Sequence, residues 1–141
     1  MIRHIKDDKL LYAIIIPANF DAEGLHFVTP DDMSLQLAYM RHPEGKVIAS
    51  HYHNDVNREV TGTKEVLFIR KGKVRVDFYD HEQVYAKSVV LQQGDIILLV
   101  EGGHGFEALE ELVMLEVKQG PYGGDYKTRF PSVPADKIRI E

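Results

Sequence analysis

Short apolar segments separated by turn-forming residues dominate this sequence and restrict the folds open to it. Apolar runs such as Leu10–Ile16 alternate with turn clusters such as His42–Gly45 and Gln92–Asp95. No segment keeps the helical spacing of apolar residues, which repeats about every 3.6 residues. Strands with turns roughly every ten residues are typical of β-sandwiches and barrels. We expect strands at 10–16, 34–40, 47–52, 65–69, 74–79, 85–91, 96–100 and 112–117.

The turn Arg70–Lys73 contains Gly72 and lies between two of the expected strands, a pattern typical of a β-hairpin. Its basic residues alternate with apolar ones, so we interpret them as the solvated face of that hairpin. Closure of the sheet would remove edges that otherwise pair with other molecules. The sequence therefore favours a closed all-β arrangement.

Size and composition fit one domain. The chain has 141 residues, of which 44% are hydrophobic, and it contains no cysteine, internal repeat or interior linker. Such a chain can bury a full core without disulfides, and the lack of cysteine excludes thiolate zinc sites. We expect a single domain at 1–141, with its core at about 34–118, N-terminal strands and turns at 1–33, and an irregular tail at 119–141 that wraps the domain or a neighbouring subunit.

Charge and termini bear on partners and location. The net charge is −5, and no basic stripe of the kind that binds a nucleic acid is present. Residues 1–9 are charged and lack the apolar centre of a signal peptide, and the apolar run 10–17 is too short to cross a bilayer. We expect a cytoplasmic protein with no nucleic-acid or membrane partner.

The pair His51 and His53 is the first sign of chemistry. On a strand these side chains would point to the same face, with their Cα atoms about 6–7 Å apart, so they could share a metal ion. Surface histidines also cluster by chance, and a lone pair of this kind is weak support for a metal site. The alternative is a polar, hydrogen-bonded set of histidines without metal.

The residues around this pair complete a longer pattern. Gly45 precedes His51, and Glu65 opens the next expected strand and is followed by Gly72. Further on, Gly94 opens the apolar segment that leads to the turn and histidine of Gly102–His104. Together these features resemble the two sequence motifs of the cupin superfamily.

The resemblance implies a fold and a ligand set. The fold is a double-stranded β-helix, also called a jelly roll or cupin barrel, and it binds one divalent metal ion inside. Nitrogen and carboxylate ligands without sulfur suit Fe, Mn, Ni, Co, Cu or Zn, and the sequence does not select one of them. The implied ligands are His51, His53, Glu65 and His104.

The sequence departs from the family pattern in three places, one of which is Ala108, where the family commonly has Asn four residues after the last histidine. Residues 54–64 lengthen the segment between His53 and Glu65, and Glu59 is therefore a competing ligand. We favour Glu65 because it begins an apolar strand and lies at the family's spacing from Gly72. The turn before His104 is one residue shorter than usual, which could displace this histidine.

The insertion at 54–64 has two interpretations. It is a lid or substrate-contacting loop beside the metal, or a solvated hairpin without a role. Four residues are candidates for substrate binding, two of them cations in the insertion and two of them aromatic residues on flanking strands: Arg58, Lys64, Tyr39 and Phe106. No catalytic residue is assigned, although Glu59, Lys64 and Tyr39 are possible acid–base partners.

Three functions follow from the implied site. The first is a metal-dependent enzyme acting on a small polar or carbohydrate-like substrate, of isomerase, dioxygenase or decarboxylase type. The second is a non-catalytic module that binds a sugar or anion and acts through a protein partner, and the third is a structural barrel. Residues 116–122 resemble the C-terminal segment of small cupins of bacterial surface-polysaccharide biosynthesis, which favours a carbohydrate substrate. The resemblance also implies a homodimer, with Leu10–Ile16 and the tail as candidate contacts.

Overall fold

The structure is a computed structural model that describes residues 1–124 and 126–141. Within these residues it contains strands and one short 3-10 turn, and no α-helix. The strands are β1 (Arg3–Lys6), β2 (Leu11–Ile16), β3 (Gly24–Phe27), β4 (Ala38–Arg41), β5 (Glu65–Lys71), β6 (Lys73–Tyr79), β7 (Tyr85–Gln92), β8 (Ile96–Leu99), β9 (Gly103–Ala108) and β10 (Val113–Lys118), and the turn is η1 (Ala135–Lys137).

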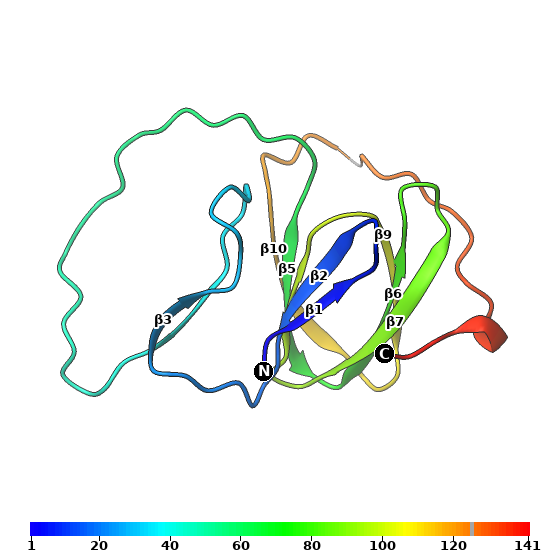
Figure 1. The fold of residues 1–141 in the computed structure, drawn as a ribbon, viewed down its shortest axis with the longest axis horizontal. Helices are drawn as coiled ribbons and strands as arrows, with labels where there is room; N and C mark the ends of the chain where they lie inside the picture. The colour runs from blue at the N-terminus through cyan, green and yellow to red at the C-terminus, as the bar shows by residue number, and fades with distance from the viewer. Residues whose placement is uncertain (125) are drawn as a thin grey trace.

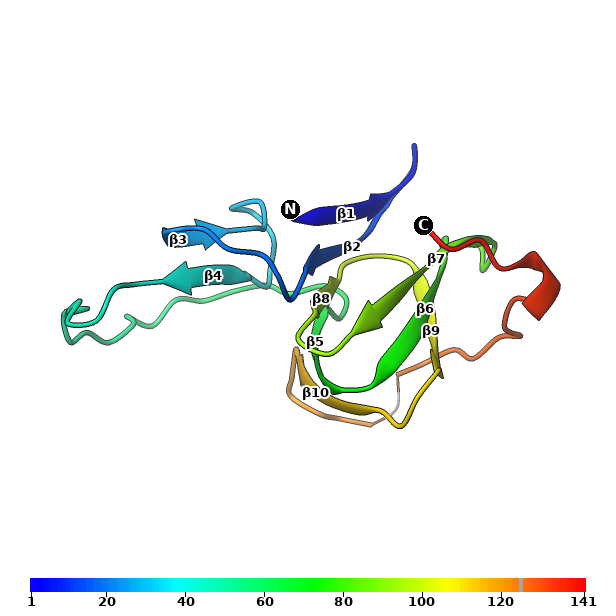
Figure 2. The ribbon, with the colours of Figure 1, turned by 90° about the horizontal axis from the view of Figure 1, so that it is seen from below.

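The strands form three sheets. A five-stranded sheet has the order β1-β2-β8-β5-β10, a three-stranded sheet has the order β7-β6-β9, and β3 and β4 form a separate ribbon. Every pairing between these strands is antiparallel. Figures 1 and 2 show the two larger sheets packed against each other, with the β3–β4 ribbon to one side. The expectation of an all-β antiparallel fold is confirmed.

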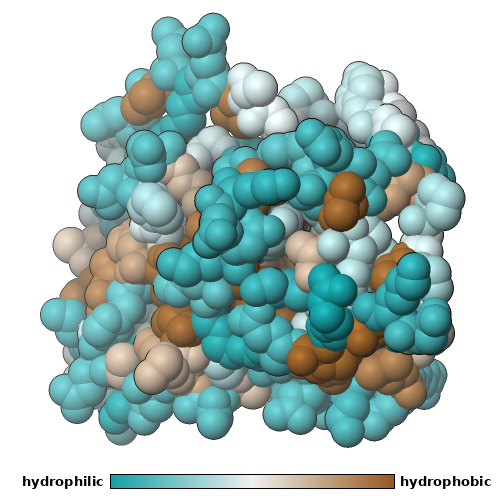
Figure 3. Space-filling model, turned by 45° about the vertical axis from the view of Figure 1, so that its right-hand side comes forward, coloured by the Kyte–Doolittle hydropathy of each residue, from teal (hydrophilic) through white to brown (hydrophobic). Residues whose placement is uncertain are grey.

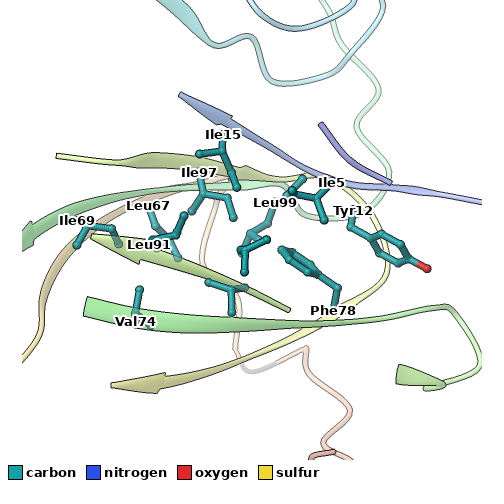
Figure 4. Close-up of a cluster of buried hydrophobic side chains, with 13 residues drawn as sticks. Ile5, Tyr12, Ile15, Leu67, Ile69, Val74, Phe78, Leu91, Ile97 and Leu99 are labelled. Carbon is teal, nitrogen blue, oxygen red and sulfur yellow. The ribbon is translucent and has the colours of Figure 1, made fainter. Parts of the chain in front are cut away.

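Alternating apolar residues of both larger sheets make the core (Figure 4). Leu67 and Ile97 from the five-stranded sheet lie in one buried cluster with Val76 and Phe78 from β6. The core also draws on the N-terminal residues, since Ile5 is fully buried in the same cluster. The whole cluster comprises Ile5, Tyr12, Ala13, Ile15, Leu67, Ile69, Val74, Val76, Phe78, Val89, Leu91, Ile97 and Leu99.

A second apolar layer covers the outer face of the five-stranded sheet. Ile14 and Leu98 are fully buried there, and Val66 packs against them. Their cover comes from residues 28–37, which cross the sheet and include Leu35 among the packed side chains. The strand β2 is thus buried between β1 and β8 in its own chain, and it offers no free edge to a partner.

Glycine 72 turns the chain from one sheet into the other. β5 pairs with β8 and β10, whereas β6 pairs with β7 and β9, so the predicted hairpin between β5 and β6 is wrong. Gly72 has φ +87°, and a Cβ there would lie 2.0 Å from the carbonyl oxygen of Glu111. Only glycine fits this corner, because any side chain would collide with the backbone that leads into β10.

A buried polar network fastens the C-terminal tail to the three-stranded sheet. Asp77 on β6 is 3% exposed and accepts two hydrogen bonds from Arg75, at 2.8 and 3.1 Å. The hydroxyl of Ser88 donates to the same carboxylate at 2.5 Å. The backbone of Ser88 pairs in turn with Arg139 and Glu141 of the tail. The end of the tail therefore packs on its own domain. The sequence had left open whether the tail contacts its own domain or a neighbouring subunit.

The strand predictions succeeded and failed at particular places. Most expected strands are present, but residues 47–52 form no strand in the described structure, and the prediction there is wrong. β9 was not predicted, whereas β1 and β3 lie within 1–33, where strands and turns were expected and only the strand at 10–16 was given bounds. β9 and β10 each pair on one side only, so the described sheets are not hydrogen-bonded into a closed barrel. The described chain also lacks a helix long and apolar enough to span a membrane.

Candidate metal site

Glu65 and His104 meet at one end of the core. Glu65 is the first residue of β5 and alternates with Leu67 and Ile69, so its side chain is on the inner face of the five-stranded sheet. His104 lies on β9 opposite Phe78, a core residue, and therefore also faces inward. The His104 Nε2 and Glu65 Oε1 atoms are 2.8 Å apart.

The environment of this pair favours a charged carboxylate. The hydrogen bond from His104 lowers the pKa of Glu65, and partial burial of the carboxyl acts in the opposite direction. The nearby cations Lys118 and Lys127 add to the lowering. The Glu65 side chain is 15% exposed and that of His104 is 32% exposed, so both remain accessible from outside. A carboxylate kept ionised is in the form that binds a metal.

His51 and His53 lie in a different part of the molecule. Both belong to an extended segment, residues 46–64, which we call the arm and which stands away from the sheets (Figure 1). The two rings are near each other, with centroids 5.5 Å apart and planes at 68°. The Nδ1 atom of His51 is 2.8 Å from the carbonyl oxygen of Ala49. Both side chains are exposed.

The four implied ligands thus form two separate pairs. His104 is beside Glu65, and His51 is beside His53. No group of three or more histidine, cysteine, aspartate or glutamate side chains among the described residues is placed to hold a metal ion. The competing carboxylate, Glu59, is exposed in the arm, whereas Glu65 is in contact with His104.

The four predicted substrate-binding residues have different surroundings. Phe106 packs beside His104, with ring centroids 5.3 Å apart. Tyr39 lies on β4, where its hydroxyl donates to Asp21 at 3.2 Å and its ring packs edge-on against Phe20. Arg58 is exposed in the arm, whereas Lys64 ends the arm beside β10, where its backbone NH donates to the Gln119 side chain at 2.8 Å and its carbonyl accepts from the Gln119 NH at 3.2 Å. Only Phe106 among the four lies against a predicted ligand that faces the core.

Lys118 is a residue near the site that was not singled out from the sequence. It pairs with Glu65 in the register between β10 and β5. Its Nζ atom is 3.0 Å from a carboxylate oxygen of Glu116, two residues earlier on the same face. The sequence pattern could have indicated this residue. Met114, Glu116 and Lys118 occupy alternate positions of β10, so their side chains point to the same inner face of the sheet. A polar pair at inward positions of an apolar strand indicates a site.

No family model, no curated protein and no solved structure matches the chain.

Proposed function

We propose that this protein is a metal-binding cupin, and that it is a metal-dependent enzyme acting on a small polar or carbohydrate-like substrate. The observation that supports it best is the Glu65–His104 pair, with ligand atoms 2.8 Å apart at the open end of the core. Two ligand atoms each about 2.1 Å from one metal ion, at a right angle, are about 3 Å apart. The pair therefore suits two adjacent positions on one ion.

The donor set fits a divalent transition metal. His51 and His53 supply two more imidazoles on a segment that lacks a strand partner, and both rings are exposed and near each other. Three imidazoles and one carboxylate suit Fe, Mn, Ni, Co, Cu or Zn. We propose that docking of the arm beside β9 completes both the ligand set and a cupin barrel. When bound, the metal would polarise the substrate as a Lewis acid or exchange electrons with it.

The chain's own residues would prepare this site. Glu65 is held as an ionised ligand by its contact with His104 and by the charge of Lys118. Phe106 packs against the ring of His104 and restricts its rotation. Lys118 and Glu116, which are paired at 3.0 Å, add a donor and an acceptor beside Glu65 that could hydrogen-bond a polar substrate. These roles agree with a polar, oxygen-rich substrate.

Metal exchange tests the proposal. Protein stripped with a chelator and reloaded separately with Fe(II), Mn(II), Ni(II) or Zn(II) would be assayed for sugar isomerisation by NMR, and for oxygen uptake or decarboxylation with small acids. We expect one metal to raise the melting temperature and to support one reaction. If metal removal changes neither the melting temperature nor the binding of any compound, the metal-centred proposal is refuted. Metal binding without turnover would instead favour the non-catalytic binding module.

A further inference from the structure

The arm exposes apolar side chains that a folded chain normally covers. Val47 is 81% exposed, Ile48 is 58% exposed and Tyr52 is 84% exposed. Residues 46–53 are extended but belong to no strand of the described structure. Figure 2 shows the arm and the β3–β4 ribbon projecting together to one side of the larger sheets. The arm therefore has the composition of a strand without the sheet that such a strand requires.

The three-stranded sheet has a free edge with matching properties. β9 pairs with β6 on one side and with no strand of the described structure on the other. Its inward residues His104 and Ala108 are exposed, and Phe106 is 41% exposed, because no described strand pairs with β9 on this edge. An open strand edge next to uncovered apolar side chains is a template for another strand. Apolar patches also interrupt the hydrophilic surface in Figure 3.

We propose that the occupant of this edge is the arm of a second copy of the chain. Each copy would add residues 46–53 to β9 of the other, so that two identical contacts form around a twofold axis. Each metal site would then combine Glu65 and His104 of one chain with His51 and His53 of its partner. The metal-binding part of this inference rests on the proposed function, whereas the exchange of arms does not.

Strand alternation sets the register of this contact. All pairings between the strands are antiparallel, so we expect the same for the arm. An antiparallel register with His51 opposite His104 places Ala49 opposite Phe106 and Val47 opposite Ala108. The last two pairs each join an alanine to a larger residue on the inner face, and the first pair brings two histidines together. Tyr52 then points outward, because it alternates with the two histidines.

The conformation of the arm favours a partner over its own barrel. The arm leaves β4 in the direction away from the larger sheets and returns only at Glu65 (Figures 1 and 2). Only the end of the arm comes near its own β9, through the contact of Glu65 with His104, and residues 46–53 project away from that strand. A second copy can accept the arm as it stands, so that Val47 and Ala49 of each arm cover Ala108 and Phe106 of the other chain. Such an exchange between identical chains is domain swapping.

Cysteine cross-linking tests the exchange without reference to metal. The chain has no cysteine, so any disulfide must come from introduced residues. The double variant Val47→Cys/Ala108→Cys should form covalent dimers under mild oxidation, visible by non-reducing electrophoresis. The matched control is Ile48→Cys/Ala108→Cys, whose first cysteine faces the other side of the arm and should give at least tenfold less dimer. Disulfides within one chain, no cross-link, or a monomeric wild type at micromolar concentration by light scattering would overturn the exchange.

Mixed chains test the shared site. A chain carrying His51→Ala and His53→Ala is co-expressed with a chain carrying Glu65→Ala and His104→Ala. Arm exchange restores one complete ligand set in each mixed dimer, so we expect one tightly bound metal ion per purified mixed dimer and none in either parent. Full cross-linking of the cysteine variant without metal binding by the mixed dimer would overturn the metal site shared between chains. The exchange of arms would still stand. A wild type that binds no metal would instead refute the proposed function, while the cross-link still decides the exchange.

Discussion

The carboxylate of Asp77 should contribute more to stability than any charged side chain on the surface. Asp77 is 3% exposed and accepts hydrogen bonds from Arg75 and Ser88. Substitution Asp77→Ala leaves the guanidinium and the hydroxyl without this partner. Removal of one member of a buried ion pair typically costs about 3–5 kcal/mol, and we expect about 3 kcal/mol because Arg75 keeps its contact with Glu107 at 2.7 Å.

Urea denaturation followed by circular dichroism measures this effect. With a slope of about 2 kcal/mol per molar urea, a loss of about 3 kcal/mol lowers the midpoint by about 1.5 M. The matched control is Glu107→Ala, which removes the exposed partner of the same Arg75, and it should cost about 0–1 kcal/mol. We infer that burial of Asp77, rather than its ion pair with Arg75, determines the loss in the free energy of unfolding. Equal urea midpoints for the two variants would refute it.

Further predictions concern the sheet corner, the core and acid stability. Gly72→Ala should destabilise the fold by at least about 2 kcal/mol in urea denaturation, because its Cβ would collide with the Glu111 carbonyl; a loss below about 0.5 kcal/mol would contradict the described turn. Ile97→Val, at a fully buried position, should cost about 0.5–1.5 kcal/mol in the same assay, and no loss would show that the core is loosely packed there. The hydrogen bond from Tyr12 lowers the pKa of Asp7 to about 2, so its stabilising effect is complete above about pH 4 and disappears as the pH falls towards 2. Asp7→Asn should therefore lower the melting temperature at pH 7, with a difference from wild type that narrows below pH 4; a constant difference would be inconsistent with this pKa.

Local patterns predicted the strands whose partners lie in the described sheets. The run Leu11–Ile16 and the segment Ile96–Leu99 became neighbouring strands because their apolar residues fill the core from adjacent positions. The expected strand at 47–52 has similar composition but no partner, since strand propensity does not say which edge a segment will meet. The strand β9 escaped notice because glycines occupy alternate positions at its start.

The candidate site was predictable in its residues but not in its assembly. Spacing identified Glu65 and His104, and the structure places them 2.8 Å apart although 39 positions separate them in the sequence. Spacing also joined them to His51 and His53, which the structure keeps in the arm. Residues 46–64 form no strand in the described structure, so the two histidines have no fixed place beside Glu65 and His104. Sequence alone could not show that separation, because it depends on where the rest of the chain packs.

Metal analysis of protein purified without an affinity tag tests the central claim most directly. We predict a stoichiometric transition metal in the wild type and in Glu59→Ala, whose carboxylate is exposed in the arm. Glu65→Ala should lose at least about tenfold in metal affinity, because it removes the carboxylate that lies against His104. Full retention of metal by Glu65→Ala, or loss of metal in Glu59→Ala alone, would contradict the proposed site.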